Sequence, residues 1–293
     1  MKRIIVIVLI IMLLLASCGV GNKNVESKYQ SFVCDMANDG IVSKADVDYW
    51  MGISRTNDSA PQSQRIVFEG EEYNVVYYSS WTGSLWPYEV NEYHSDDNKV
   101  DFYLRADNDE LVYYGLISWT SFADEFRKDP VSLEEARGIA DELAEKHINI
   151  TEYFVTDSIK PVSFYEGDDY VNYYFEYVRY VDGLPSTDTV NITLGYNGGL
   201  IFAGWPNAGL FSDKGNINID ISEVDRSVES KLEEVYGKKY DFSYEQSFRK
   251  ITYTPEMELA VVTGLNINLL LKGGDESYNS GIVIVTIIPD YKK

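Results

Sequence analysis

Apolar residues return at helical spacing in the middle of the chain. Residues 132 to 147 read SLEEARGIADELAEKH, with apolar side chains every three or four positions and charged side chains between them. This spacing predicts a helix that buries one face. Ser132 and Glu135 form the Ser-x-x-Glu capping box that satisfies free amides at a helix start. The helix is therefore expected to begin at Ser132.

A second period, of two residues, follows further along the chain. Residues 190 to 194 read VNITL, in which the apolar side chains alternate with polar ones. This alternation predicts a half-buried strand. Asn197-Gly198 can adopt the positive φ angles of a tight hairpin turn, so residues 200 to 203 are expected to form the return strand. The pattern of residues 173 to 181 predicts one more strand.

The same order of patterns recurs at a regular spacing. Ser-x-x-acid boxes begin at Ser43, Ser132 and Ser222, which lie 89 and 90 residues apart. The strand patterns at 100–104 and 111–115 match those at 190–194 and 200–204. The expected fold class is α+β, with tandem small modules that each pack one helix on an antiparallel sheet.

These patterns divide the chain into five predicted regions. They are a signal peptide at 1–17, a tether at 18–40, a divergent module 1 at 41–128, module 2 at 129–215 and module 3 at 216–293. In module 3, residues 281–288 take the place of the first hairpin strand. That module is therefore expected to lack its last strand.

The first 18 residues, MKRIIVIVLIIMLLLASC, have a basic start, an apolar run and small residues at the end, as in an export signal. Residues 15–18 (LASC) resemble the lipobox of bacterial lipoproteins. The resemblance implies cleavage before Cys18, acylation of Cys18 and anchoring on the outer face of the cytoplasmic membrane. The alternative is a transmembrane anchor, although the apolar run is short for a span of about 20 residues.

The charge balance bears on the partners of the protein. The formal net charge is −22, and removal of Lys2 and Arg3 with the signal leaves 23 basic and 47 acidic residues, or −24. Such a surface repels nucleic acid, so no nucleic-acid partner is expected. Cys34 is the only other cysteine, and an acylated Cys18 could not form a disulfide with it.

Module 2 carries a family resemblance. Its S-x-E-E-A-x-x-I-A helix, its aromatic-rich strands and its V-x-I-x-L and G-G-L-I-x-F segments, within Ser132 to Trp205, resemble the tandem PepSY-type modules of Gram-positive lipoproteins. The resemblance implies a cystatin-like α+β fold. It also implies a non-enzymatic role, the binding or regulation of an extracytoplasmic protein such as a peptidase. It carries over no site residues.

Residues 35 to 46 resemble a calcium loop of the dockerin or EF-hand type. The ligands would be the side chains of Asp35, Asp39, Ser43 and Asp46 and the carbonyl oxygen of Ile41. A third side-chain ligand is missing, because position 37 is alanine. The alternative is an acidic loop that leads into a capped helix. Calcium is the only cofactor that the sequence suggests.

Aromatic residues are densest between positions 77 and 93. Trp81, Trp86 and Tyr88 lie in a predicted loop rich in Gly, Ser and Pro, where burial is harder. They are candidates for stacking on a sugar ring or a peptide side chain. The alternative is ordinary packing in strands. If they bind sugar, the protein would be a glycan- or peptidoglycan-binding lipoprotein.

No catalytic residue is predicted. His94, in a predicted loop, and His147, at a helix end, are the only histidines, and neither has evident partners for a metal site or a Ser-His-Asp relay. His147 is expected to complement the dipole of the helix end. A hydrolase with a carboxylate pair stays open as an alternative, because the chain is rich in acidic residues.

Overall fold

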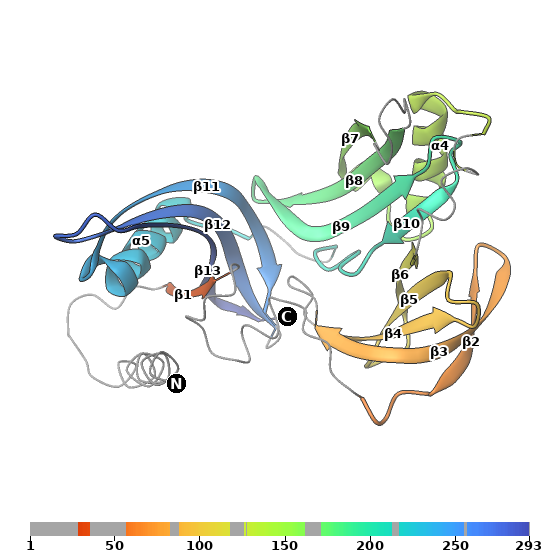
Figure 1. Ribbon diagram of the computed structural model, residues 1–293, viewed down its shortest axis with the longest axis horizontal. Coiled ribbons are helices and arrows are strands. Elements are labelled where there is room, and N and C mark those ends of the chain that lie inside the picture. The colour runs from red at the N-terminus through yellow and green to blue at the C-terminus, as the bar shows by residue number, and fades with distance from the viewer. Residues whose placement is uncertain are drawn as a thin grey trace. The chain divides into compact units, whose positions relative to one another are not determined.

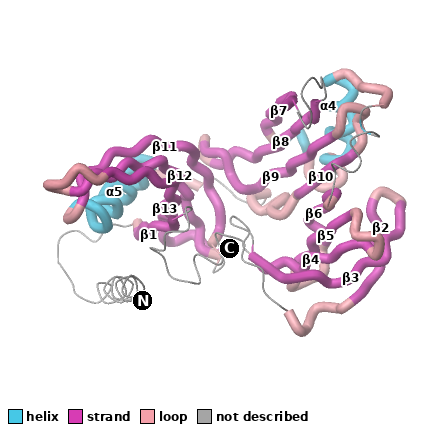
Figure 2. Tube along the Cα trace, in the orientation of Figure 1, coloured by secondary structure: helices cyan, strands magenta, loops and turns pink. Residues whose placement is uncertain are grey.

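The computed structural model describes residues 29–35, 57–82, 88–117, 126, 128–161, 171–212, 217–254 and 257–292. These residues are mostly β-sheet, with thirteen strands and two α-helices (Figures 1 and 2). The helices are α4 (Leu133–Ala144) and α5 (Ile221–Leu232). No helix in this part of the chain has the length and apolar character needed to cross a membrane.

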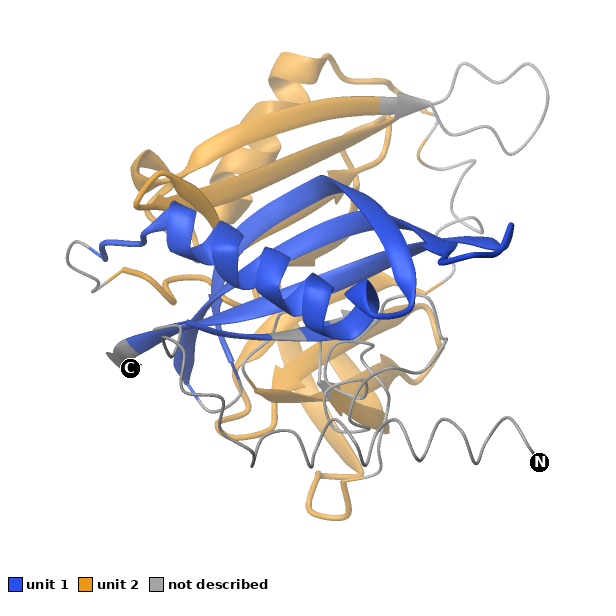
Figure 3. Cartoon of the chain, turned by 90° about the vertical axis from the view of Figure 1, so that its left-hand side faces the viewer, with its two compact units in different colours: residues 1–53, 82–87, 217–293 blue, residues 54–81, 88–216 orange. Residues whose placement is uncertain are grey.

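The chain divides into two compact units. Unit 1 comprises residues 1–53, 82–87 and 217–293, and unit 2 comprises residues 54–81 and 88–216 (Figure 3). Unit 1 contains α5 and four strands. These are β1 (Gln30–Asp35), β11 (Tyr240–Tyr253), β12 (Glu258–Leu271) and β13 (Ser277–Lys292).

Unit 2 contains α4 and nine strands in the order β7-β8-β9-β10-β6-β5-β4-β3-β2. The strands are β2 (Ser63–Phe68), β3 (Glu71–Thr82), β4 (Glu89–Ser95), β5 (Val100–Arg105), β6 (Leu111–Leu116), β7 (Phe154–Pro161), β8 (Val171–Val181), β9 (Leu184–Leu194) and β10 (Leu200–Gly204). β10 pairs antiparallel with both β9 and β6, and so it joins the strands on either side into one sheet.

Helix α4 covers one face of this sheet. The predicted capping box is confirmed: the Ser132 side chain accepts a hydrogen bond from the Glu135 amide, and the Glu135 side chain accepts one from the Ser132 amide. Ala136 and Ala140 are fully buried against β8 and β9, in one core with Phe175. The small alanine side chains let the helix approach the sheet closely. Each large aromatic ring buried beneath the helix contributes about 2–3 kcal/mol to the free energy of folding.

The fully buried Asp188 on β9 fixes the turn after β10. It accepts hydrogen bonds from Tyr153 Oη at 2.5 Å, Arg179 Nε at 3.1 Å and the backbone amides of Gly209 at 3.0 Å and Phe211 at 3.1 Å. Four donors saturate the two carboxylate oxygens. This carboxylate therefore stabilises the fold and is not available to a ligand.

In unit 1 the strand order is β1-β13-β12-β11, and α5 lies on this sheet. The prediction that Ser222 caps α5 is wrong. Asp220 is the N-cap, and its carboxylate accepts hydrogen bonds from the amides of Ser222 and Glu223. A carboxylate at this position also interacts favourably with the helix dipole, which explains why it is preferred to the serine two residues later.

Strand β1 lies in the region predicted to be a tether. It pairs antiparallel with β13, from Gln30 opposite Ile287 to Asp35 opposite Ile282. Ser31 Oγ lies 2.6 Å from both Ser227 Oγ on α5 and Thr286 Oγ1 on β13. The strand that module 3 was expected to lack is thus supplied by the N-terminal part of the chain.

The predicted fold class, α+β with tandem modules of one helix on one sheet, is wrong. The described residues are dominated by strands, and the regions assigned to modules 1 and 2 share one sheet and one core. The reason is the pairing of β6 with β10, since each offers the other an open edge of amides and carbonyls. The predicted first helix, at 43–53, lies outside the described residues.

Candidate functional site

The candidate site is the face of the unit 2 sheet that points away from α4, called here the outer face. Tyr177 donates a hydrogen bond to Asp141 of α4 at 2.7 Å, and Phe175 is buried in the core, so odd positions of β8 face the helix. Successive strand residues point to opposite faces. Tyr174 and Glu176 therefore lie on the outer face.

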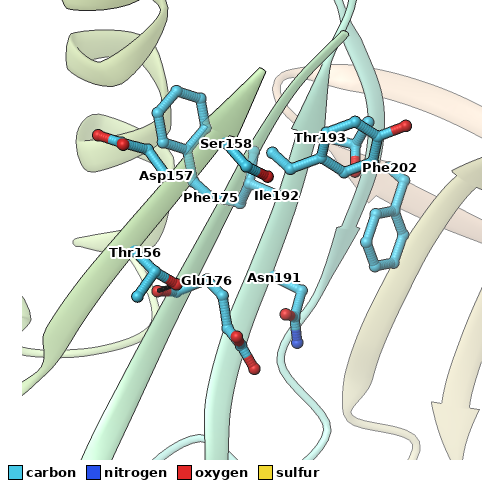
Figure 4. A pocket seen from close by; sticks show the side chains of 10 residues that line it. Thr156, Asp157, Ser158, Phe175, Glu176, Asn191, Ile192, Thr193 and Phe202 are labelled. Carbon is cyan, nitrogen blue, oxygen red and sulfur yellow. Dashed lines mark hydrogen bonds between the residues drawn. The ribbon is translucent and has the colours of Figure 1, made fainter. Parts of the chain in front are cut away.

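A hollow of about 260 Å³ opens over strands β7 to β10 (Figure 4). The outer face contributes four hydroxyl groups, one of them a phenol, together with one amide, one carboxylate and two aromatic rings. These side chains are Thr156, Ser158, Tyr174, Glu176, Asn191, Thr193 and Phe202. Thr193 is buried and the two rings are half-buried. Polar groups converging on a partly apolar hollow are typical of a small-ligand site.

The hollow does not contain the carboxylate pair of a glycosidase. Asp157 also borders it, but Asp157 pairs with Arg137 Nη1 of α4 at 3.0 Å and so belongs to the covered face. Figure 4 shows Asp157 and Glu176 on different sides of the strands. Glycoside hydrolysis needs two carboxyl groups on either side of one bond. Glu176 is the only carboxylate that the described outer face brings to the hollow.

The strand register aligns outer-face residues into two rows across seven strands, from β7 to β4. Residues directly opposite one another on paired strands share a face. The first row is Thr156, Glu176, Asn191, Gly204, Tyr113, Tyr103 and Glu92. The second row is Ser158, Tyr174, Thr193, Phe202, Gly115, Asp101 and His94. The hollow occupies the β7–β10 half of both rows.

Aromatic rings continue the site beyond the hollow. The Phe202 and Tyr113 ring centroids are 5.3 Å apart, those of Tyr113 and Tyr103 are 4.0 Å apart and nearly parallel, and Trp81 meets Tyr103 at 5.1 Å and 86°. We call these four residues the ring series. Gly115 permits it, because a Cβ at that position would collide with Tyr113 Oη.

Asp101 lies beneath the ring series and is only 9% exposed. Tyr103 Oη donates to its Oδ2 at 3.0 Å, whereas Oδ1 is buried without a hydrogen-bond donor in the described part of the chain. Burial is the main cause that raises the pKa of Asp101 to about 6; the hydrogen bond from Tyr103 lowers this pKa, and the nearby charge of Glu92 raises it. A carboxyl group without a full set of donors is costly to ionise, so Asp101 exchanges its proton near neutral pH.

His94 does not form a nucleophile–base pair. It lies on strand β4, not in the predicted loop, with Nε2 2.9 Å from Glu92 Oε1 and its ring stacked on Tyr78 at 4.1 Å. Ser79 Oγ donates to Glu92 Oε2 at 2.8 Å. Because the serine bonds the carboxylate and not the imidazole, His94 is not placed to take its proton.

His147 lies on the other side of the sheet, stacked on Trp205 at 3.7 Å. Burial lowers its pKa to about 4. The imidazole is therefore neutral at pH 7, and the predicted interaction of a charged His147 with the helix dipole is wrong.

The structure describes two of the three predicted aromatic site residues. Trp81 lies in strand β3 and ends the ring series. Tyr88 lies just before β4, where the Arg105 guanidinium sits 4.1 Å from its ring centroid. Trp86 lies outside the described residues. Trp81 thus lies in a strand and not in the predicted loop, whereas the stacking role of these residues stays a prediction.

Most of the other predicted site residues fall outside the described part of the chain. Of the predicted calcium ligands, only Asp35 belongs to a described element, as the last residue of β1. Asp39, Ile41, Ser43 and Asp46, and the predicted lipid-bearing Cys18, lie in segments that are not described. Among the described residues, no three His, Cys, Asp or Glu side chains come together as a metal site.

The residues of the hollow were not predicted as a site. The sequence does carry a signal for them: Tyr174, Glu176, Asn191 and Thr193 occupy alternate positions of two predicted strands, which places the two residues of each strand on one face. The register that sets them side by side joins β7, β8, β9 and β10, and no local pattern specifies it. The chain has no match among protein-family models, curated proteins or solved structures. The PepSY resemblance therefore stays a prediction.

Proposed function

We propose that this protein is a non-enzymatic binding lipoprotein of the bacterial cell envelope, and that its outer face in unit 2 binds a glycan. The observation that carries the proposal is the hollow of about 260 Å³, with its amide, carboxylate, hydroxyl and aromatic lining. Sugars present hydroxyl groups around a ring with apolar C–H faces. Side-chain amides and hydroxyls can bond the former, and aromatic rings can cover the latter.

The charge of the lining restricts the kind of sugar. None of the ten residues that border the hollow is basic, and Glu176 adds a carboxylate. An anionic sugar would be repelled by this carboxylate and by the net charge of −22. A neutral or amine-bearing glycan, such as the N-acetylated sugars of cell walls, fits the lining better.

The absence of a reactive pair on the described outer face favours binding over catalysis. Both oxygens of Glu92 have protein partners, the side chain of Asp101 is nine-tenths buried, and the hollow receives a single outer-face carboxylate, that of Glu176. Hydrolysis would require an acid and a base or nucleophile that both reach the substrate. Cys18 would hold the protein at the outer face of the cytoplasmic membrane through its lipid.

Calorimetric titration of the mature chain with N-acetylglucosamine oligomers tests the proposal. We expect binding that Asn191→Ala weakens at least tenfold, because the lost amide serves the ligand. Val67→Ala, at a 61% exposed position on β2, is the matched control and should bind as the unmodified chain does. Absence of binding to these oligomers and to soluble peptidoglycan fragments would refute the proposal.

A protein partner is the second candidate, and strand β7 favours it. Within the described sheet of unit 2, β7 pairs only with β8, and it carries Phe154 at 61% and Ile159 at 49% exposure. Open strand edges accept an added strand from a partner. A partner bound in this way would slow hydrogen exchange of the β7 amides. Unchanged exchange in the presence of envelope proteins would argue against it.

A further inference from the structure

The hollow is one end of a longer surface on the same face. Phe202 lines the hollow and also begins the ring series, which passes through Tyr113 and Tyr103 to Trp81 on β3. The two rows keep residues of β7 to β4 directly opposite one another, because the register shift in β10 lies before Phe202 and outside both rows. Any ligand that extends out of the hollow past Phe202 therefore meets these rings.

The size of this surface exceeds that of one sugar. Seven strand steps separate β7 from β3 in the sheet. With neighbouring strands about 4.8 Å apart, the surface runs for roughly 34 Å across the strands. The hollow takes up only the first three steps, from β7 to β10. The remaining length would be unused by a mono- or disaccharide.

Polar groups and rings alternate along this path. Glu176, Asn191 and Thr193 precede the ring of Phe202, and Glu92 and His94 lie on β4, the strand between β5, which carries Tyr103, and β3, which carries Trp81. The side chains of Glu92 and His94 are 15% and 18% exposed, so each presents part of its surface. A linear sugar chain repeats apolar ring faces and hydroxyl groups in the same way. The rows contain no lysine or arginine, which excludes a match to an anionic polymer.

We propose that the ligand is a linear, neutral or amine-bearing polysaccharide chain that lies across the strands, from the hollow to Trp81. This inference rests on the proposed function and adds the length and direction of the ligand. The hollow holds one end of the bound stretch, and the ring series holds the units that follow. Trp81 contacts the end of the bound stretch that lies farthest from the hollow.

Titration with N-acetylglucosamine dimer, tetramer and hexamer tests this geometry on the mature chain. We expect the affinity to rise more than tenfold from dimer to hexamer. Trp81→Phe should remove most of that gain and leave dimer affinity unchanged, whereas Phe202→Ala should weaken every length. Tyr244→Ala, a 38% exposed ring position in unit 1, is the control. Circular dichroism of each variant verifies that it is folded.

The outcomes separate the two proposals. Equal affinity for dimer and hexamer, or a length gain that Trp81→Phe leaves intact, would overturn the extended path and leave a glycan-binding hollow. Tighter binding of an oligogalacturonate than of the neutral hexamer would overturn the inference about charge. Absence of binding at any length, together with absence of binding to soluble peptidoglycan fragments, would overturn the proposed function itself.

Discussion

The two units use similar sheets in different ways. In unit 1, Ser31 and Thr286 mark the face toward α5, and the opposite face carries a buried apolar cluster of Ala260, Val262, Val283 and Val285. In unit 2, the face opposite α4 carries carboxylates, amides, hydroxyls and phenols. Strands buried on both faces are apolar in nearly every position, as are residues 259–262 and 282–285.

This difference indicates which of the two units is suited to bind a polar ligand. A sheet with apolar groups on both faces contributes stability, because each face excludes water. A sheet with a polar, half-buried face retains groups that can exchange water for a ligand. Unit 2 meets the second description, and unit 1 the first. Substitutions in both units test this contrast.

The largest expected effect is the loss of the buried carboxylate in unit 2. Asp188→Ala leaves Arg179 without its buried partner and the Gly209 and Phe211 amides without an acceptor. We expect the free energy of unfolding of unit 2 to fall by about 3–5 kcal/mol. Urea denaturation measures it. Asp157→Ala, which removes a half-exposed ion pair with Arg137, is the control and should cost less than about 1 kcal/mol.

Adding or removing a hydroxyl group should change the stability of the two units to different extents. Val262→Thr places a hydroxyl in the buried apolar cluster of unit 1, where Val262 is fully buried. It should lower the free energy of unfolding of that unit by up to about 3 kcal/mol. Thr193→Val removes a hydroxyl from the outer face of unit 2 and should be close to neutral for stability. Equal losses from the two variants, measured by thermal unfolding, would contradict the contrast.

The pH dependence of unit 2 should reflect Asp101. Its folded pKa of about 6 lies above the usual value of 3.8, so the folded state holds the proton more tightly than the unfolded state does. Ionisation therefore opposes folding, and stability contributed by the protonated form is lost as the pH rises from about 4 through 6. Asp101→Asn should raise stability at pH 7.5 by on the order of 2 kcal/mol and have little effect at pH 4. If Asp101→Asn lowered the stability at pH 7.5, the ionised Asp101 carboxylate would have to be stabilised by other groups of the folded protein, which would contradict the prediction.

The smallest expected effect concerns β1 in unit 1. Ser31→Ala removes the hydroxyl that bonds Ser227 and Thr286, at a cost of about 1 kcal/mol. Hydrogen exchange of the β1 amides should become several-fold faster, while exchange in unit 2 is unchanged. Exchange that stays equally slow would mean that backbone pairing alone holds the strand.

Single helices and turns were predictable where the pattern of a short segment specifies its structure. The helix that begins after Ser132 matches its pattern, and the predicted turn has the expected positive φ of 79° at Gly198 but not at Asn197. The fold class failed because it depends on contacts between distant segments. The β6–β10 pairing merges two predicted modules, and β1 joins a sheet whose other strands begin at Tyr240. Neither pairing leaves a local signal.

The candidate site was predictable only as separate residues. The ring of Trp81 makes it a candidate, but the sequence predicts a loop from residue 79 onward, whereas the structure continues strand β3 to Thr82. The hollow arises from the register of four strands, of which β7 carries no strong alternation. A pattern can assign Glu176 or Asn191 to a face. It does not show which side chain from another strand lies beside it.

The pairing of β1 with β13 also limits how far the protein can reach. If Cys18 is acylated, the chain advances only eleven residues from the lipid-bearing cysteine to Tyr29, which is buried just before β1. A fully stretched chain of that length spans at most about 40 Å. The start of β1 would then stay within about 40 Å of the acylated residue, which would confine unit 1 to the zone next to the bilayer.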